Sequence, residues 1–225
     1  MQGTFHFIGH AAFTLSAKGR CAVFDPYLEG CPERLAPKDI RADWVFVTHG
    51  HDDHVGSAYE IAKENNALFI STAEMAGEAA RRGCRTRAMH IGGSASVEFG
   101  RVKIAPAFHG AGVPGGHACG FFIDFYGARV YYAGDTGVFS DMALYARLFP
   151  VDLAILPIGD NFTMGPGDAL EAVKLIGARH VIPVHYNTWP VIAQDPYAFK
   201  EVAERETKSL VHVVAPGASL DLASL

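Results

Sequence analysis

The chain has 225 residues, of which 49% are hydrophobic, and its 19 basic and 24 acidic side chains give a formal net charge of −5. This acidic balance argues against a nucleic-acid partner, because phosphate binding needs clustered Lys and Arg. No apolar run approaches the roughly 20 residues needed to span a bilayer, and no signal-like segment opens the chain, so we expect no membrane partner and a cytoplasmic location.

Three short strands are predicted at residues 4–8, 11–16 and 20–24, because alternating or apolar runs there are broken by glycines. Asp25 and Pro26 then end the third strand, since proline cannot continue a ladder of hydrogen bonds. Asp25 has two interpretations. It is either an ordinary turn residue or a partner that holds a metal-binding imidazole.

A buried strand at residues 44–47 is predicted to lead into the most informative stretch of the sequence, which reads Thr48-His49-Gly50-His51-Asp52-Asp53-His54. Histidines this dense would repel one another if protonated, whereas neutral imidazoles are the commonest ligands of zinc-like ions. The pattern His-x-His-x-Asp-His therefore indicates a metal site. The alternative is a polar surface loop that happens to be rich in histidine.

The spacing within this stretch indicates two ions. Gly50 lets the backbone fold tightly, so that His49 and His51 can converge on one ion. Asp53 and His54 are adjacent and must point in different directions. That arrangement suits a second ion at roughly 3.5–4 Å from the first, as in two-metal hydrolytic sites.

Strands and helices alternate after the metal-binding stretch. Helices are predicted at 55–65 and 73–82, and strands at 67–70, 86–90, 95–99 and 101–108. The last of these strands ends at His109, which a glycine-rich loop follows. This repeats the arrangement of the first ligand stretch. On the residues alone, His109 is as much an ordinary loop histidine as a ligand.

The second half continues in the same way, and nothing in the chain has the composition of a linker. We therefore expect one domain over residues 1–225. Asp168 is expected to cap the first helix of this half. The predicted elements are strands at 118–125, 128–133, 152–157, 179–184 and 209–214, and helices at 168–177 and 196–206.

Five polar residues of the second half follow predicted strands. Asp135, in a Gly-Asp-Thr-Gly run, is either a metal-bridging carboxylate or a turn residue. His185 comes directly after a strand, and Tyr186 beside it is a proton donor, a pocket wall or a core residue. Asn161 and Thr163 lie in a loop on the ligand side, where they either contact substrate or only shape the loop.

These motifs together resemble the metallo-β-lactamase superfamily, whose signature is the same His-x-His-x-Asp-His pattern. The later motifs fall in the order in which that superfamily supplies its other ligands: His109, then Gly134-Asp135-Thr136-Gly137, then Pro183-Val184-His185-Tyr186. Gly9-His10 and the run from Pro157 to Pro166 resemble a narrower branch of metal-dependent hydrolases, similar to ascorbate-6-phosphate lactonases. The resemblance implies an α/β fold of the four-layer αββα sandwich type.

The resemblance also implies how the ligands divide. Two divalent transition-metal ions are expected, Zn by preference, with Mn, Ni or Fe as alternatives. One ion would be held by His49, His51 and His109, and the second by Asp53, His54 and His185, with Asp135 as a bridge. Asp53 and Asp135 would be the catalytic carboxylates. The expected substrate contacts are His10, Asn161, Thr163 and Tyr186.

The expected activity is that of a binuclear metal-dependent hydrolase, in which a metal-bridging hydroxide attacks a small ester or lactone, with or without a phosphate group. A small molecule is the expected partner, and a homo-oligomer is compatible with the sequence. Three alternatives stay open. They are a phosphodiesterase or nuclease of the same fold, a metal-binding scaffold without catalysis, and an oxygen-reducing diiron protein.

Overall fold

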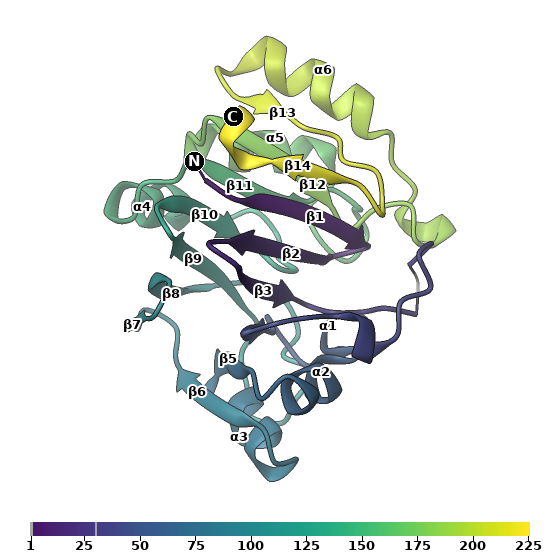
Figure 1. Cartoon of the computed structure of the whole chain (residues 1–225). Helices are drawn as coiled ribbons and strands as arrows, with labels where there is room; N and C mark the ends of the chain where they lie inside the picture. Colours follow the sequence, from purple (N-terminus) through teal and green to yellow (C-terminus); the bar gives the residue numbers. More distant parts are fainter. Residues whose placement is uncertain (1, 30) are drawn as a thin grey trace.

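Two mixed β-sheets form the centre of the computed structural model, which describes residues 2–29 and 31–225 (Figure 1). The first sheet holds the strands of the N-terminal half and one strand from the end of the chain. Its strands, in spatial order, are β14 (Ser219–Asp221), β1 (Thr4–Gly9), β2 (Ala12–Ala17), β3 (Arg20–Phe24), β4 (Trp44–Phe46), β5 (Leu68–Thr72) and β6 (Arg85–Met89).

The second sheet repeats this plan with the strands of the C-terminal half. Its order is β13 (Leu210–Val211), β12 (His180–Val184), β11 (Leu153–Pro157), β10 (Ala128–Tyr132), β9 (Cys119–Phe125), β8 (Gly100–Pro106) and β7 (Ser94–Val97). In both halves the early strands pair antiparallel and the later ones parallel. The strands β8, β10 and β12 therefore run in the same direction and end at the same edge of the sheet.

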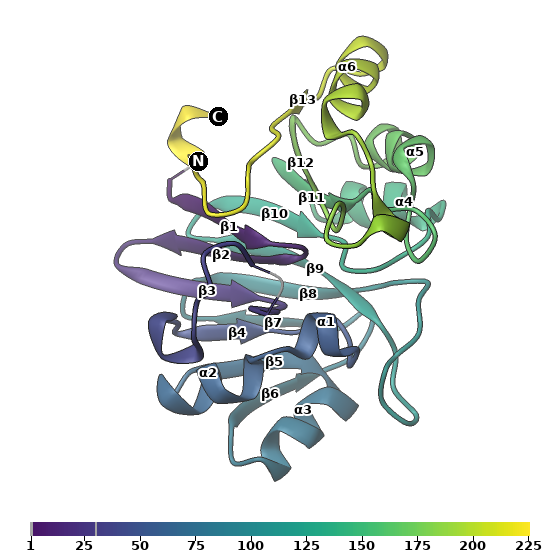
Figure 2. The same cartoon turned by 90° about the vertical axis from the view of Figure 1, so that its right-hand side faces the viewer.

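Helices cover the outer face of each sheet. In the first half they are α1 (Asp52–Val55), α2 (Ala58–Glu64) and α3 (Ala73–Arg81), and in the second half α4 (Asp141–Leu148), α5 (Pro166–Ile176) and α6 (Pro196–Glu206). Figure 2 shows α4, α5 and α6 grouped together, away from α2 and α3. Three short 3-10 turns complete the structure: η1 (Pro37–Asp39), η2 (Pro190–Ile192) and η3 (Leu222–Ser224).

Alternating side chains hold the layers together, because successive residues of a strand point to opposite faces. In β4, Val45 packs against the α2 and α3 layer, whereas Phe46 packs between the sheets. In β10, Tyr131 packs against α4 and α5, whereas Tyr132 enters the core between the sheets. Each such buried side chain stabilises the fold by about 1.5–3 kcal/mol. The predicted four-layer αββα sandwich is confirmed.

Some element boundaries differ from the prediction. The helix expected at 55–65 is broken at Gly56, whose φ is +39° and where a Cβ would lie 2.5 Å from the Pro26 carbonyl oxygen. The prediction of Asp168 as a helix cap is wrong. Gly165 occupies that position, because Pro166 has a fixed φ suited to the first turn. The strand expected at 209–214 shortens to β13.

The helix α4 and the strand β14 were not predicted, nor were the three 3-10 turns. β14 comprises only three residues, and it exists because it pairs antiparallel with β1 from the other end of the chain. The two ends of the chain consequently lie close together (Figure 1). Among the helices in the part of the chain that the structure describes, none is long and apolar enough to cross a membrane.

Candidate metal centre

The seven predicted ligands lie together at one edge of the sandwich, although they are far apart in the sequence. The loop after β4 carries His49 and His51, and the short helix α1 carries Asp53 and His54. The other three follow β8, β10 and β12, whose ends meet at this edge; they are His109, Asp135 and His185. The strand directions therefore bring these side chains together.

Three imidazoles form the first ligand group. The Nε2 atom of His49 lies 2.9 Å from Nδ1 of His51, and Nε2 of His109 lies 3.2 Å from the same atom. All three rings can present a nitrogen to one ion. Nitrogen donors of this kind suit Zn and neighbouring divalent ions.

A second ligand group lies beside the first and contains Asp53, His54 and His185, together with His10. The Asp53 Oδ2 atom is 3.8 Å from Nε2 of His54 and 3.9 Å from Nε2 of His185. At these separations the donor atoms could bind one metal ion together. The predicted division of the ligands is thus compatible with the geometry.

Asp135 lies between the two groups. Its Oδ1 atom is 3.2 Å from Nε2 of His54, and its Oδ2 atom is 3.1 Å from Nε2 of His185. The same Oδ2 is 3.6 Å from Nε2 of His109, in the first group. Of the two interpretations that the sequence allowed, this position favours the metal-bridging carboxylate over the turn residue.

Several buried polar atoms of the centre have no hydrogen-bond partner among the described residues. They are Nε2 of His54, Oδ1 of Asp135 and both ring nitrogens of His185. A buried polar atom left unsatisfied costs about 1–3 kcal/mol. A bound cation would satisfy Nε2 of His54, Oδ1 of Asp135 and Nε2 of His185, so these atoms fit the divalent ions that the resemblance implies.

The electrostatics of the centre also favour positive charge. Burial alone would lower the pKa of His54, but the carboxylates of Asp135 and Asp25 on either side hold that pKa well above its usual value. Burial would raise the pKa of Asp135, yet His54 and His185 hold it well below its usual value. Burial lowers the pKa of His49 to about 2, so this imidazole is neutral and ready to bind a metal.

Asp25 lies next to the predicted ligands and forms hydrogen bonds with residues around them. Its carboxylate is fully buried and accepts hydrogen bonds from the Thr48 amide (2.8 Å), the Thr48 hydroxyl (2.6 Å) and the Tyr132 hydroxyl (2.6 Å). The Nδ1 atom of His54 lies 2.7 Å from the same carboxylate, which orients the ring and leaves Nε2 facing the ligand group. Asp25 is therefore a hydrogen-bond partner of His54, a predicted ligand, and not only a turn residue.

His10 is the one member of the second group that the sequence did not predict as a ligand. Its Nε2 is 3.2 Å from Oδ2 of Asp53, its Nδ1 is 2.8 Å from the Thr188 hydroxyl, and its ring is 4.1 Å from that of His185. Burial lowers the pKa of His10 to about 4, so the ring is neutral and its Nε2–H donates to Asp53. The substrate contact predicted for His10 stays a prediction, and its observed neighbours include the predicted ligands Asp53 and His185.

A cavity of about 230 Å³ opens onto the ligands. It is lined by His51, Asp53, His109, Asp135, Phe162, His185 and Trp189. Asn161 and Thr163 are not among these lining residues, although Phe162, which lies between them in the sequence, is. Tyr186 lines a separate cavity of about 240 Å³ beside His10, and burial raises its pKa to about 12. Sequence reasoning missed Phe162 and Trp189, for which no local pattern signals a binding role.

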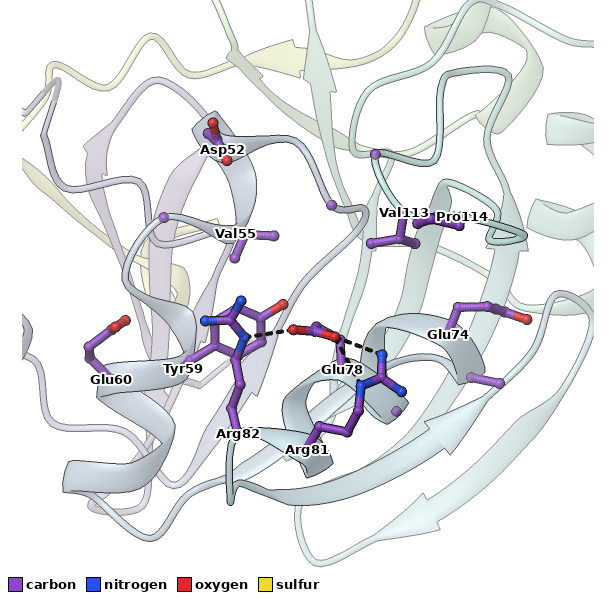
Figure 3. A pocket seen from close by; sticks show the side chains of 15 residues that line it. Asp52, Val55, Tyr59, Glu60, Glu74, Glu78, Arg81, Arg82, Val113 and Pro114 are labelled. Carbon is purple, nitrogen blue, oxygen red and sulfur yellow. Dashed lines mark hydrogen bonds and ion pairs between the residues drawn. The ribbon is translucent and has the colours of Figure 1, made fainter.

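A larger cavity of about 680 Å³ lies on the far side of the ligand loop, between α2, α3 and the loop 112–114 (Figure 3). Its arginines are already paired. Arg81 and Arg82 donate to the Glu78 carboxylate at 2.6 and 2.8 Å, and Arg82 lies 4.5 Å from the Tyr59 ring centre. None of the predicted ligands lines this cavity, so the candidate active site is the cavity of about 230 Å³ that opens onto them.

Comparison with known proteins gives relatives over most of the length of the chain. The β-lactamase superfamily domain matches residues 22–186. A UPF0173 metal-dependent hydrolase of Natranaerobius thermophilus is 47% identical over 217 residues, covering 96% of this chain and 98% of that protein. The UPF0173 metal-dependent hydrolase YtkL of Bacillus subtilis is 44% identical and covers 89% and 92%. The structure of Igni18, a metallo hydrolase of Ignicoccus hospitalis, superposes with a TM-score of 0.90 at 33% identity, covering 98% of both chains.

Proposed function

This chain belongs to the β-lactamase superfamily and, within it, to the UPF0173 metal-dependent hydrolases, and from that premise we propose that it hydrolyses a small ester or lactone at a pair of divalent metal ions. The observation that carries the proposal is the position of Asp135, whose carboxylate faces both ligand groups at once. A carboxylate in that position can bridge two ions. Zn is the ion we favour, because most of the donor atoms are imidazole nitrogens.

When bound, such a pair of ions lowers the pKa of water and polarises the substrate oxygen on which charge develops. The side chains of the protein do the rest. Asp53 and Asp135 offset part of the positive charge of the ions, and His10 holds the Asp53 carboxylate toward the second group. In the net reaction the ester C–O bond breaks and the carbonyl carbon bonds to the water oxygen. The two protons of water end on the acid and the alcohol.

The alternatives are less well supported. A nuclease or phosphodiesterase that acts on nucleic acid would bind backbone phosphates with clustered Lys and Arg. None of the described residues that line the cavity at the ligands is Lys or Arg, and Arg81 and Arg82 are paired and line a different cavity. A metal-binding scaffold without catalysis would not need a cavity that opens onto the ligands. The cytoplasmic location, the single domain and a homo-oligomeric state stay predictions of the sequence.

Elemental analysis and a turnover assay on Asp135→Asn test the proposal. The zinc-reconstituted wild type should hold two ions per chain and hydrolyse simple esters or lactones. Asp135→Asn should stay folded, bind the second ion more weakly and lose most of its turnover, because a neutral amide bridges two cations poorly. The exposed Asp168 of α5 gives the matched control, and Asp168→Asn should behave like the wild type. Fewer than one ion per chain, or normal activity in Asp135→Asn, would refute the proposal.

A further inference from the structure

The ligand cavity is lined by two chemically different kinds of side chain. Five of its lining residues are predicted ligands, and the other two are the aromatic residues Phe162 and Trp189. None of the described residues that line the cavity is Lys or Arg. A phosphate substituent that does not itself bind the metals would need such a cation, because Arg and Lys are the usual partners of phosphate oxygens.

Phe162 lines the cavity from a tightly turned loop. It is 53% exposed, which is unusual for so large an apolar side chain. The two residues before it, Asp160 and Asn161, both have left-handed backbones, with φ of +61° and +54°. Asp and Asn tolerate this conformation better than most residues other than glycine, so both fit a tight turn at this place.

Hydrogen bonds fix this loop against the metal centre. The Asp160 amide donates to the Met164 carbonyl at 3.0 Å, and the Asn161 amide donates to the Asp160 carboxylate at 2.7 Å. The Met164 amide donates to the carbonyl of Thr136, the residue after Asp135. The ring of Phe162 is thus presented to solvent beside the proposed ions by a loop that is tied to a ligand segment.

Trp189 reaches the same cavity from a different segment, four residues after His185. Its ring packs edge-on against His10 at 4.8 Å and lies 6.3 Å from the Tyr27 ring. These contacts hold the indole in place while one part of it lines the cavity. Two aromatic side chains from separate segments therefore bound a space of about 230 Å³, which suits one small substituent.

We infer that this site selects substrates with an uncharged aromatic or branched alkyl group next to the scissile bond, with Phe162 and Trp189 as the residues that determine this specificity. The inference rests on the proposed function and narrows its substrate class. An apolar group loses water contacts when it packs against the two rings. A phosphate group in the same place would lose its hydration without gaining a cation.

Two measurements on the zinc-loaded protein test the inference. The first is hydrolysis of methyl phenylacetate compared with methyl acetate, as the ratio of kcat/KM values. The second is calorimetric binding of phenylacetohydroxamate compared with acetohydroxamate, and with the ring-phosphonylated 4-phosphonophenyl analogue. We expect the phenyl compound to be favoured at least tenfold over both comparison compounds in binding, and over methyl acetate in hydrolysis. Phe162→Ala and Trp189→Leu should each reduce this preference several-fold, with metal content unchanged.

Leu148, which is 64% exposed on α4 and outside the cavity, gives the control. Leu148→Ala should keep the full preference. The inference is overturned if the wild type prefers the phosphonylated compound, if it shows no preference for the phenyl group, or if both aromatic variants keep the wild-type ratio. Selective binding of the phenyl compound without hydrolysis of any ester would refute the proposed function and leave the specificity intact, so the two failures can be told apart.

Discussion

Replacing Tyr132 by Phe should destabilise the protein, because it removes the hydroxyl that donates to Asp25 at 2.6 Å and lies 3.4 Å from the Ala11 carbonyl oxygen. The Tyr132 hydroxyl donates to Oδ2 of the buried Asp25 at 2.6 Å, and the ring packs edge-on against Phe13 at 5.0 Å. Phenylalanine keeps the ring contacts and removes only the donor. A hydrogen bond to a charged group is worth about 1.5–3 kcal/mol, so the free energy of unfolding should fall by about 2 kcal/mol. For a chain of this size that corresponds to a Tm lower by roughly 4–8 °C.

The neighbouring tyrosine provides a matched control. Tyr131 is also fully buried, but its hydroxyl has no hydrogen-bond partner among the described residues. Tyr131→Phe makes the same chemical change and removes an unsatisfied polar atom, so it should be neutral or stabilising. The assay is urea unfolding of the metal-free protein, followed by circular dichroism, because bound metal would add its own contribution to stability.

The comparison of the two variants decides whether the Asp25 network stabilises the fold. Tyr132→Phe should lower the urea midpoint with little change in slope, since the same surface is exposed on unfolding. Tyr131→Phe should leave the midpoint where it is or raise it. If Tyr132→Phe stays within about 0.5 kcal/mol of the wild type, or if Tyr131→Phe loses as much, then the hydroxyl of Tyr132 is not a significant donor to Asp25.

His10→Ala should weaken binding of the second ion by about 10–100-fold in a chelator competition. His10→Gln keeps a hydrogen-bond donor and should bind that ion more tightly than His10→Ala does. Equal metal affinities of the two variants would contradict the role of His10 as a donor to Asp53. The Nδ1 atom of His180 lies 3.0 Å from Nε2 of His212, and burial lowers the pKa of both imidazoles. The pKa of histidine in an unfolded chain is about 6.5. The stability that the pair contributes should therefore be complete above that pH and be lost as the pH falls below it. Urea unfolding at several pH values measures this loss, which His212→Gln should reduce. Gly112→Ala should lower metal affinity, because its φ is +65° and its Cβ would lie 2.3 Å from the backbone of the ligand loop. Gly115→Ala, at φ +72° with open space around it, is the control, and the same metal affinity in both variants would refute the steric argument.

The sequence by itself predicted most strands and the metal-binding stretch, because both depend on local patterns of residues. The four-layer fold and the division of the ligands were implied by the resemblance to the metallo-β-lactamase superfamily. Alternating apolar residues predict strands wherever one face is buried, and most strands were predicted within a few residues of their observed bounds. The His-x-His-x-Asp-His spacing indicates a metal site without knowledge of the fold. The resemblance to the metallo-β-lactamase superfamily is confirmed by the relatives, whereas the similarity to lactonases stays a prediction.

The residues that support and surround the ligands were decided only by the tertiary structure. Asp25 has the sequence of a turn residue, and it becomes the partner of His54 because β3 pairs in parallel with β4 and brings them together. Trp189 and Phe162 come from two distant loops and share one cavity only after the strands of the second sheet align. Their roles depend on distances between segments far apart in the chain, and a local pattern of residues carries no information about such distances.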